Sequence, residues 1–264
     1  MPSNAGARRV LELLWGHQQP GRRGPRPTLS RDRIVKAAVN IADTEGLEAM
    51  SMRRVAEDLG VGTASLYTYV PGKDELFALM VDGMIAMSRL PHEHPGGWRE
   101  KVTAWAREDW QDYRAHPWVI QLTSARHLAG PGTLAWMNSA LSVLEDTGLT
   151  EGEMLAAVNS VDAFVRGQAR EAIQVAMERD EMRDGSEGGE GRSWQEVEEE
   201  FLRTHVDWNQ YPSMLRIVET TGDADAEASF EFGLESLLDG IEARMRRRIG
   251  ERAAAGETLD TRGT

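Results

Sequence analysis

The sequence predicts an all-α protein of about ten helices. Apolar residues recur three and four positions apart along most of the chain, as they do in helices with one buried face. Glycine and proline separate these stretches, and no convincing strand pattern or internal repeat appears. The 264 residues are enough for one large or two moderate domains with a proper core.

Composition excludes several classes of protein. Cysteine is absent, which rules out disulfides, thiolate metal sites and a cysteine nucleophile and fits a reducing cytoplasm. No apolar run is long enough to span a bilayer, and the N-terminus lacks the apolar core of a signal peptide. We therefore expect a soluble, cytoplasmic protein without a membrane partner.

The first 28 residues form an extension with two parts. Residues 7–15 could form a short amphipathic helix, although a helix of this length is marginal without a docking surface. Residues 16–27 are rich in proline, glycine and arginine and cannot build a core. Their arginines are either part of a solvated tail or a basic arm for DNA phosphate or an adjacent minor groove: Arg22, Arg23 and Arg26.

The next predicted helix covers residues 31–45. Ser30 can cap its first turn, and Gly46 ends it. Its inner stripe follows the spacing i, i+3, i+4 and i+7 and consists of Ile34, Ala37, Ala38 and Ile41.

Residues 51–73 are the stretch around which the rest of the chain is organised. Ser51 can cap a short helix, and Gly60 and Gly62 allow a tight turn after it. Thr63 can then cap a second short helix. Two short helices joined by a glycine turn describe a helix-turn-helix, whose second helix would enter a DNA major groove. An ordinary corner between two helices would give the same local pattern.

A longer helix over residues 73–89 follows and would connect this domain to the rest. Residues 91–97 contain prolines and glycines and mark a domain boundary. Beyond it we predict helices over residues 98–115, 118–128, 132–147, 151–179, 193–208 and 224–248, with a mobile loop at 183–192. The predicted organisation is an extension (1–28), a helix-turn-helix domain (29–90), a second helical domain (91–250) and a flexible tail (251–264).

The charge is distributed unevenly. The net charge is −13, but residues 1–75 carry 11 lysines and arginines against 9 aspartates and glutamates. The acidic excess therefore lies in the later part of the chain. One end can face phosphate while the other is repelled from it, which would orient the approach to DNA.

The segment from Leu29 to Met87 resembles the DNA-binding domain of the tetracycline-repressor (TetR) family along its whole length. The positions that carry the resemblance are Ala37/Ala38, Gly46, Ser51, Val55-Ala56, Leu59-Gly60-Val61, Leu66-Tyr67, Tyr69-Val70, Lys73 and Leu76. The resemblance implies double-stranded operator DNA as a partner, contacted by Arg53, Thr63, Ala64, Ser65, Tyr67, Tyr69 and Lys73. For the two tyrosines, core packing is the alternative role.

The second domain resembles the C-terminal domain of the same family in its last helix, at residues 230–241. The resemblance implies a homodimer in which two helices pair with their copies, so that two recognition helices stand about 34 Å apart. The predicted interface residues are Val158, Val165, Phe230, Leu234, Leu237, Leu238 and Ile241. The alternative is that both helices simply form the core of one chain.

The family resemblance also implies a pocket for a small-molecule inducer in the second domain. The candidates for its lining are Trp105, Trp118, His127, Trp136, Asn138, Phe164, Gln168 and Glu171. His127 and Glu171 resemble the histidine and glutamate of the tetracycline repressor's drug and metal site, but the connecting helix lacks that repressor's polar drug-binding residues. We therefore predict no metal and no cofactor. A capping histidine, a solvated glutamate and core tryptophans are the alternatives.

These observations together predict a DNA-binding regulator, most simply a repressor released from its operator by a small apolar or aromatic ligand. A DNA-binding regulator controlled by a protein partner or by abundance would fit the same sequence. An enzyme does not fit, because no catalytic or phosphate-binding motif is present and no catalytic residue is predicted.

Overall fold

The computed structural model describes residues 4–16, 29–123, 129–186, 194–221 and 225–254. Within these ranges the chain forms twelve α-helices and three short 3-10 helices, with no strand. The all-α prediction is confirmed. None of the described helices is long and apolar enough to cross a membrane.

The N-terminal domain, here called the head, is built from α2 (Arg31–Glu45), α3 (Met52–Leu59), α4 (Thr63–Tyr67) and the first half of α5 (Lys73–Met87). Ser30 caps α2 as predicted, because its hydroxyl accepts a hydrogen bond from the Arg33 amide at 3.3 Å. The predicted inner stripe of α2 is buried, and it packs against residues of the later helices that include Val55, Leu66, Val70 and Leu76.

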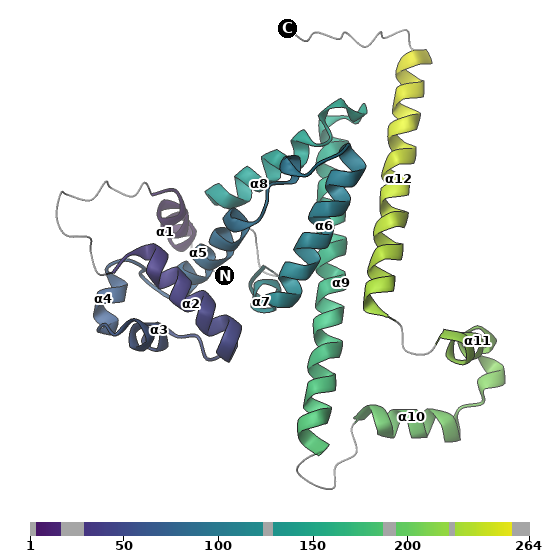
Figure 1. Cartoon of the computed structure of the whole chain (residues 1–264), viewed down its shortest axis with the longest axis horizontal. Coiled ribbons are helices and arrows are strands. Elements are labelled where there is room, and N and C mark those ends of the chain that lie inside the picture. Colours follow the sequence, from purple (N-terminus) through teal and green to yellow (C-terminus); the bar gives the residue numbers. More distant parts are fainter. Residues whose placement is uncertain (1–3, 17–28, 124–128, 187–193, 222–224, 255–264) are drawn as a thin grey trace.

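The second domain, here called the body, contains α6 (Trp98–Ala115), α7 (Trp118–Thr123), α8 (Pro131–Ser142), α9 (Glu151–Ser186) and α12 (Ala226–Ala254). The two long helices, α9 and α12, run side by side (Figure 1). Aromatic rings join them to α6: the ring of Trp110 stacks on that of Phe230 with centroids 4.6 Å apart, and Phe164 lies 5.7 Å beyond. These contacts place the body's core between α6, α9 and α12.

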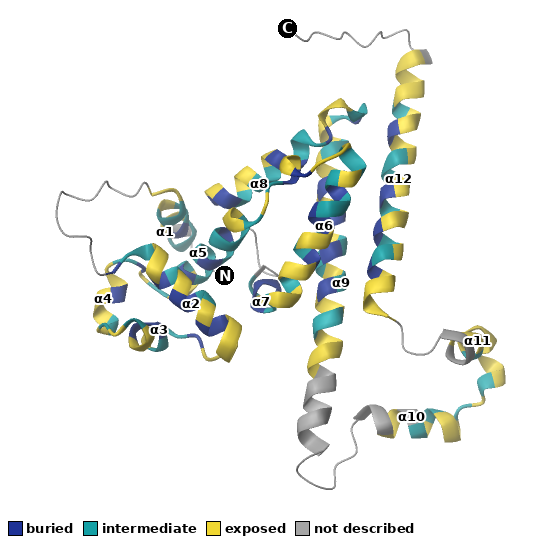
Figure 2. Ribbon diagram, in the orientation of Figure 1, coloured by how far each residue is buried: buried dark blue, intermediate teal, exposed yellow. Residues whose placement is uncertain are grey.

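A third region, here called the arm, consists of α10 (Trp194–His205) and α11 (Pro212–Thr221) with a short 3-10 helix, Trp208–Gln210, between them. The arm lies apart from the helices of the body, beyond the ends of α9 and α12 (Figure 1). Most of its described residues are exposed, whereas the head and body show buried stripes along their helices (Figure 2).

Several helix boundaries differ from the sequence prediction. Helix α8 ends at Ser142 rather than 147, and a 3-10 turn, Glu145–Thr147, follows it. Helix α9 continues to Ser186, into the first part of the predicted loop 183–192. Helix α11 was not predicted, since Pro212 was interpreted as a break when it is the helix's first residue.

The N-terminal extension contains a real helix, α1 (Asn4–Trp15), and it has a docking surface. Val10 is buried, and α1 packs against α5. The indole Nε1 of Trp15 donates a hydrogen bond to the carbonyl of Ala129 at 2.8 Å, directly before α8. Arg31 Nη1 donates to the carbonyl of Leu13 at 3.3 Å. These contacts attach α1 to both head and body, so the short helix is stabilised by tertiary packing.

Candidate DNA-binding and ligand sites

The turn between α3 and α4 has the geometry that the glycines predicted. The hydroxyl of Ser51 accepts a hydrogen bond from the Arg54 amide at 3.1 Å and caps α3. Gly60 ends the helix at φ 65° and ψ 32°, in the left-handed region that a side chain disfavours. The Val61 amide then donates to the Ala56 carbonyl at 3.0 Å. Small Ala56 and fully buried Leu66 hold the two helices together, which is the arrangement of a helix-turn-helix.

Thr63 does not cap α4, and that prediction was wrong. The helix begins at Thr63 itself, Gly62 stands at the N-cap position, and no side chain caps this end. The Gly62 carbonyl accepts from the Ser65 amide at 2.9 Å instead. Backbone geometry at Gly62 therefore starts the helix, and the Thr63 hydroxyl is not engaged in capping it.

The candidate DNA contacts on α4 are accessible. Ala64 and Ser65 are exposed, Thr63 is partly exposed, and the Tyr67 side chain is 50% exposed. Tyr69 differs, because it is half-buried against the core of the head. Core packing is therefore a better explanation for the role of Tyr69 than for that of Tyr67.

The two predicted cations flank this helix. The Arg53 Nε atom forms an i,i+4 ion pair with Glu57 at 2.8 Å, on an exposed part of α3. The ammonium of Lys73 lies 5.2 Å from the centre of the Phe77 ring at the start of α5. Both side chains are exposed, and an exposed pair of this kind is weak enough to be exchanged for phosphate. The predicted basic arm, Arg22, Arg23 and Arg26, lies outside the described residues.

The body contains a cavity of about 370 Å³ between four helices. Helix α5 contributes Ile85, and Ser88 follows as the cap of its C-terminal end, which places the end of the connecting helix in the cavity wall. The remaining lining comes from α6, α8 and α9 and consists of Asp109, Tyr113, Thr133, Trp136, Met137, Asn159, Asp162, Ala163 and Arg166. Apolar walls with a few convergent polar groups, in a volume of about 300–1,000 Å³, are characteristic of small-molecule sites.

The polar groups of this cavity form an acidic cluster with one cation. Arg166 pairs with Asp162 one turn earlier on α9 at 2.8 Å. Burial raises the pKa of Asp109 well above its usual range, and the neighbouring carboxylates of Asp162, Asp112 and Glu108 add to the shift. Burial likewise raises the pKa of Tyr113, with Asp109 next in effect. Tyr113 therefore stays protonated and able to donate a hydrogen bond.

A buried carboxylate joins the connecting helix to the body. Asp82 of α5 accepts hydrogen bonds at the start of α8 from the Gly132 amide at 3.1 Å and from the Thr133 amide at 2.9 Å. The Thr133 hydroxyl donates to the same carboxylate at 3.0 Å. A side chain at Gly132 would meet the Asp82 carbonyl at 2.4 Å, so the helices approach as closely as glycine permits. Thr133 also lines the cavity, and it therefore contacts both the cavity and the connecting helix.

Comparisons with known proteins now identify the family. Residues 34–80 match the model for bacterial regulatory proteins of the tetR family, and residues 90–245 match the model for the tetracyclin repressor-like C-terminal domain. The chain belongs to the TetR family. The HTH-type transcriptional repressor DrrR1 of Streptomyces coeruleorubidus is 42% identical over 250 residues, 93% of this chain and 89% of that one. An HTH-type transcriptional regulator of Saccharopolyspora erythraea is 31% identical over 83% of this chain and 86% of its own length.

Solved structures resemble the chain over a similar span. Apo ActR from Streptomyces coelicolor superposes with a TM-score of 0.68 at 27% identity, covering 84% of this chain and 99% of that one. ActR in complex with actinorhodin gives a TM-score of 0.66 at 28% identity, covering 83% and 97%. TetR-family proteins are DNA-binding transcriptional regulators, and this chain is a regulator rather than an enzyme.

The body cavity of this TetR-family chain contains only part of the predicted pocket. Trp136 lines it, and Trp105 lies behind Trp136 with ring centroids 5.2 Å apart. The other predicted residues that the structure describes do not line it: Trp118, Asn138, Phe164, Gln168 and Glu171. His127 lies outside the described residues.

Four of these residues have another place. Trp118 belongs to the core of the head, and its indole donates a hydrogen bond to Asp43 at 2.6 Å. Phe164 packs in the core of the body, while Asn138 and Glu171 are exposed. For Trp118 and Phe164, the alternative role of core packing is therefore the one that the structure shows.

Sequence reasoning missed the polar side of the cavity. Asp109 and Tyr113 are four residues apart on α6, and Asp162 and Arg166 are four apart on α9, so each pair lies on one helix face. Charged residues recurring on a face next to an apolar stripe were the available signal.

The residues predicted for the dimer interface lie in the core of one chain. Val158, Val165, Phe230, Leu234 and Leu238 are buried before any partner is considered, and Leu237 and Ile241 pack against them half-buried. A side chain that is already buried has no surface to give to a second copy. The surface that α9 and α12 still expose includes Leu155 and Phe232, and the Phe232 side chain is 75% exposed.

No group of three or more histidine, aspartate or glutamate side chains in the described part of the chain is arranged to hold a metal ion. The candidate pair of His127 and Glu171 is not tested, because His127 is among the residues that are not described.

Proposed function

We propose that the protein is a transcriptional repressor that holds operator DNA as a homodimer and releases it when a small aromatic molecule enters the body cavity. One observation carries the proposal. Helix α5 is a wall of the cavity through Ile85 and Ser88, and it is also part of the core of the head through Leu76 and Met80. A ligand that moves α5 therefore moves the DNA-binding surface.

The relatives support both repression of transcription and control by a small ligand. A relative at 42% identity is a transcriptional repressor, and ActR, at 28% identity, has been solved in complex with actinorhodin. A ligand can shift the protein only by binding the DNA-free arrangement more tightly than the DNA-bound one. A coupling free energy of about 1–3 kcal/mol between two sites is typical.

The cavity indicates the chemistry of the ligand. Trp136 and Met137 offer apolar area, and Tyr113 and Arg166 offer donors. Buried Asp109 keeps its proton more readily than usual, and the carboxylates of Asp162, Asp112 and Glu108 around it disfavour an anionic ligand. We therefore propose a neutral or cationic molecule with an aromatic body and oxygen atoms at its edge.

The homodimer is supported by the apolar surface that one chain leaves uncovered. Phe232 on α12 and Leu155 on α9 are exposed, and so are Phe201 and Ile217 of the arm. Large apolar side chains that are exposed on the long helices and on the arm favour contact with another protein surface. A second copy of the chain fits this surface, because a twofold interface reuses one face and places two heads side by side on DNA. Because operator DNA lies in the cytoplasm, we propose that the regulator is cytoplasmic.

The test is a gel shift on the DNA upstream of the protein's own gene. The wild type should retard this DNA, and the double variant Arg53→Ala/Lys73→Ala should bind it at least about tenfold more weakly, because a lost pair of cationic contacts costs more than 1.4 kcal/mol. The matched control is Arg247→Ala/Arg252→Ala on α12, which removes the same charge far from α4. If both double variants lose affinity equally, net charge rather than the helix-turn-helix is responsible.

Ligand control is tested on the same complex. Aromatic metabolites that raise the melting temperature of the wild type should release the DNA, and Met137→Trp, which fills the body cavity, should abolish both effects. A regulator without a ligand would show a retarded band that no compound in the panel releases.

A further inference from the structure

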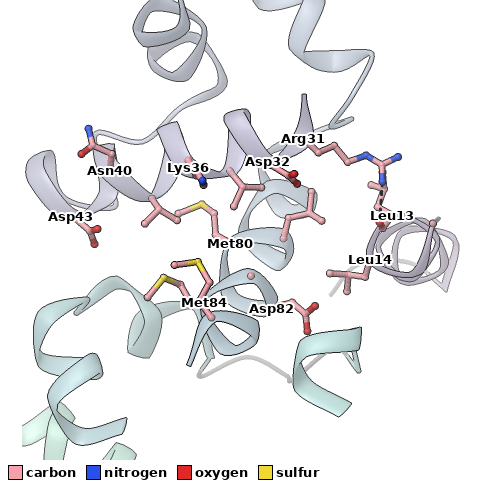
Figure 3. Close-up of a pocket in the computed structure, with 16 residues that line it drawn as sticks. Leu13, Leu14, Arg31, Asp32, Lys36, Asn40, Asp43, Met80, Asp82 and Met84 are labelled. Atoms are coloured by element: carbon pink, nitrogen blue, oxygen red, sulfur yellow. Dashed lines mark hydrogen bonds between the residues drawn. The ribbon is translucent and has the colours of Figure 1, made fainter. Parts of the chain in front are cut away.

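A second and larger cavity lies on the other side of the connecting helix. It has a volume of about 620 Å³, is open to solvent on one side, and is lined by α1, α2 and α5 (Figure 3). Its apolar walls include Leu14 of α1, Val35 and Val39 of α2, and Met80 and Met84 of α5. No part of the ligand-released repressor proposed above uses this space.

The helices around this cavity are held in place from outside it. Arg31 binds the carbonyl of Leu13, and Trp15 binds the carbonyl of Ala129, so α1 is anchored at the head and at the body. Between these anchors, Leu14 faces α5 without filling the space (Figure 3). An apolar cavity of this volume with a few polar groups at its edge is a place where small molecules bind.

Some polar side chains at the cavity already form hydrogen bonds within the described part of the protein, and others do not. Arg31 is bound to Leu13, Asp82 caps α8, and Asp43 accepts from the Trp118 indole at 2.6 Å. The side chains of Lys36 and Asn40 have no hydrogen-bonding partner among the described residues, and both line the cavity. These two can therefore bind an acceptor on a ligand.

We propose that this cavity is a second small-molecule site, for an aromatic molecule that carries one acidic or acceptor group. The rings would lie against Val39, Met80 and Met84, since methionine adapts to varied shapes. The acceptor group would bind Lys36 and Asn40. Asp32 also lines the cavity, one helical turn before Lys36, and its carboxylate limits the ligand to a single negative charge. This cavity would therefore prefer an acidic ligand, whereas the body cavity disfavours one.

The position of the site gives it a consequence for regulation. Met80 and Met84 of α5 face this cavity, whereas Ile85 and Ser88 of the same helix face the body cavity. Asp82 lines the second cavity and is bound to Thr133, which lines the first. A molecule in either cavity therefore contacts α5, each on a different face.

Methyl NMR of the full-length protein tests the proposal with 1-anilinonaphthalene-8-sulfonate, an aromatic monoanion. Methionine methyl groups mark both cavities, because Met80 and Met84 line the second and Met137 lines the first. Each signal is assigned by a methionine-to-leucine variant. Addition of the probe should shift the signals of Met80 and Met84. These shifts should saturate, with a midpoint that differs from that of the Met137 signal.

A pair of glycine variants provides the matched control. A Cβ at Gly83 would lie 3.8 Å from Val35, an ordinary contact, so Gly83→Leu can fill the second cavity without strain in the helix. It should abolish the shifts of Met80 and Met84. Gly152→Leu makes the same change on exposed α9, where nothing lies within 4 Å, and should leave the shifts intact.

Three outcomes would overturn the proposal. The Met80 and Met84 signals could fail to move at any probe concentration. They could move together with Met137 and lose the shift in Met137→Trp, which would show an effect relayed from the body cavity. Gly83→Leu could also lower the melting temperature while Gly152→Leu does not, which would show that the space is filled by the chain itself.

Discussion

The head and the arm of this chain use apolar residues in opposite ways. In the head, the side chains of Ile34, Ile41 and Leu66 are completely buried within one chain. In the arm, Phe201 is 56% exposed and Ile217 is 53% exposed. Both regions consist of short amphipathic helices, so their local patterns do not distinguish them. The difference lies in whether the same chain supplies a surface that covers the apolar face.

This contrast implies that the head is stable within one chain, whereas the stability of the arm depends on a second copy. The head has a complete core, so its folding should be independent of protein concentration. The arm, with the exposed face of α12, should be stabilised when a second copy covers it, so its stability should rise with concentration. The proposed binding of an operator as a dimer needs both regions, since one head would contact one half-site.

The largest effect should come from Phe232→Asp. Phe232 is exposed in one chain, so the variant should fold, but at a dimer interface it would bury an unpaired charge at a cost of about 3–5 kcal/mol. Light scattering should show the mass of one chain instead of two, with unchanged helical content. The control Ala253→Asp, at the exposed end of α12, should stay dimeric. A dimeric Phe232→Asp would show that the partner binds elsewhere.

Leu66→Ala should have the next largest effect, in the opposite region. It removes a fully buried side chain from the core of the head, which typically costs about 2–5 kcal/mol of unfolding free energy. Urea unfolding should show the loss at every protein concentration. Ser65→Ala, exposed on the same helix, should stay within about 0.5 kcal/mol of the wild type. A loss that disappears at high concentration would mean that the head also depends on the partner.

Asp82→Asn tests the link between the two domains. The amide replaces an oxygen that accepts from backbone with a group that donates, so at least one buried amide at the start of α8 loses its acceptor. The expected cost is about 1–3 kcal/mol. Calorimetry should show the head and body unfolding as more separate transitions. Asp74→Asn, in the exposed first turn of α5, should cost at most about 0.3–1 kcal/mol; equal effects would contradict a specific role for Asp82.

Asp109→Asn should have the smallest effect and a recognisable pH dependence. Burial raises the pKa of Asp109, so the folded protein binds its proton more tightly than the unfolded chain does. Stability from this residue is therefore present below the unfolded pKa and lost as pH rises towards the folded one. The variant should be more stable than wild type at neutral pH, and melting curves should show the difference shrinking towards pH 4. A difference that does not change with pH would contradict this account.

Most of the head could be predicted from the sequence, because its structure is governed by local chemistry. Ser30 and Ser51 cap helices, and Gly60 adopts the left-handed conformation that it was assigned. The one local error, the cap at Thr63, arose because a backbone turn at Gly62 does the same work without a side chain. The DNA-contacting role of the exposed α4 residues stays a prediction.

The body could be predicted only as a set of helices. Trp118 was assigned to a ligand pocket of the body, yet it packs in the core of the head across the domain boundary. Phe230 and Leu238 were assigned to a dimer interface and instead form the core of one chain. The helical period indicates that a helix has an apolar face but not which neighbour covers it.

The amino-acid sequence by itself determined most of the helices, the caps at Ser30 and Ser51 and the helix-turn-helix, because these depend on contacts between residues within a few positions of one another. Only the tertiary structure decided where the cavities lie, which carboxylate joins α5 to α8, and which apolar surface stays exposed. Those properties depend on packing between helices that are far apart in the chain, and side-chain periodicity is the same whichever helix lies opposite.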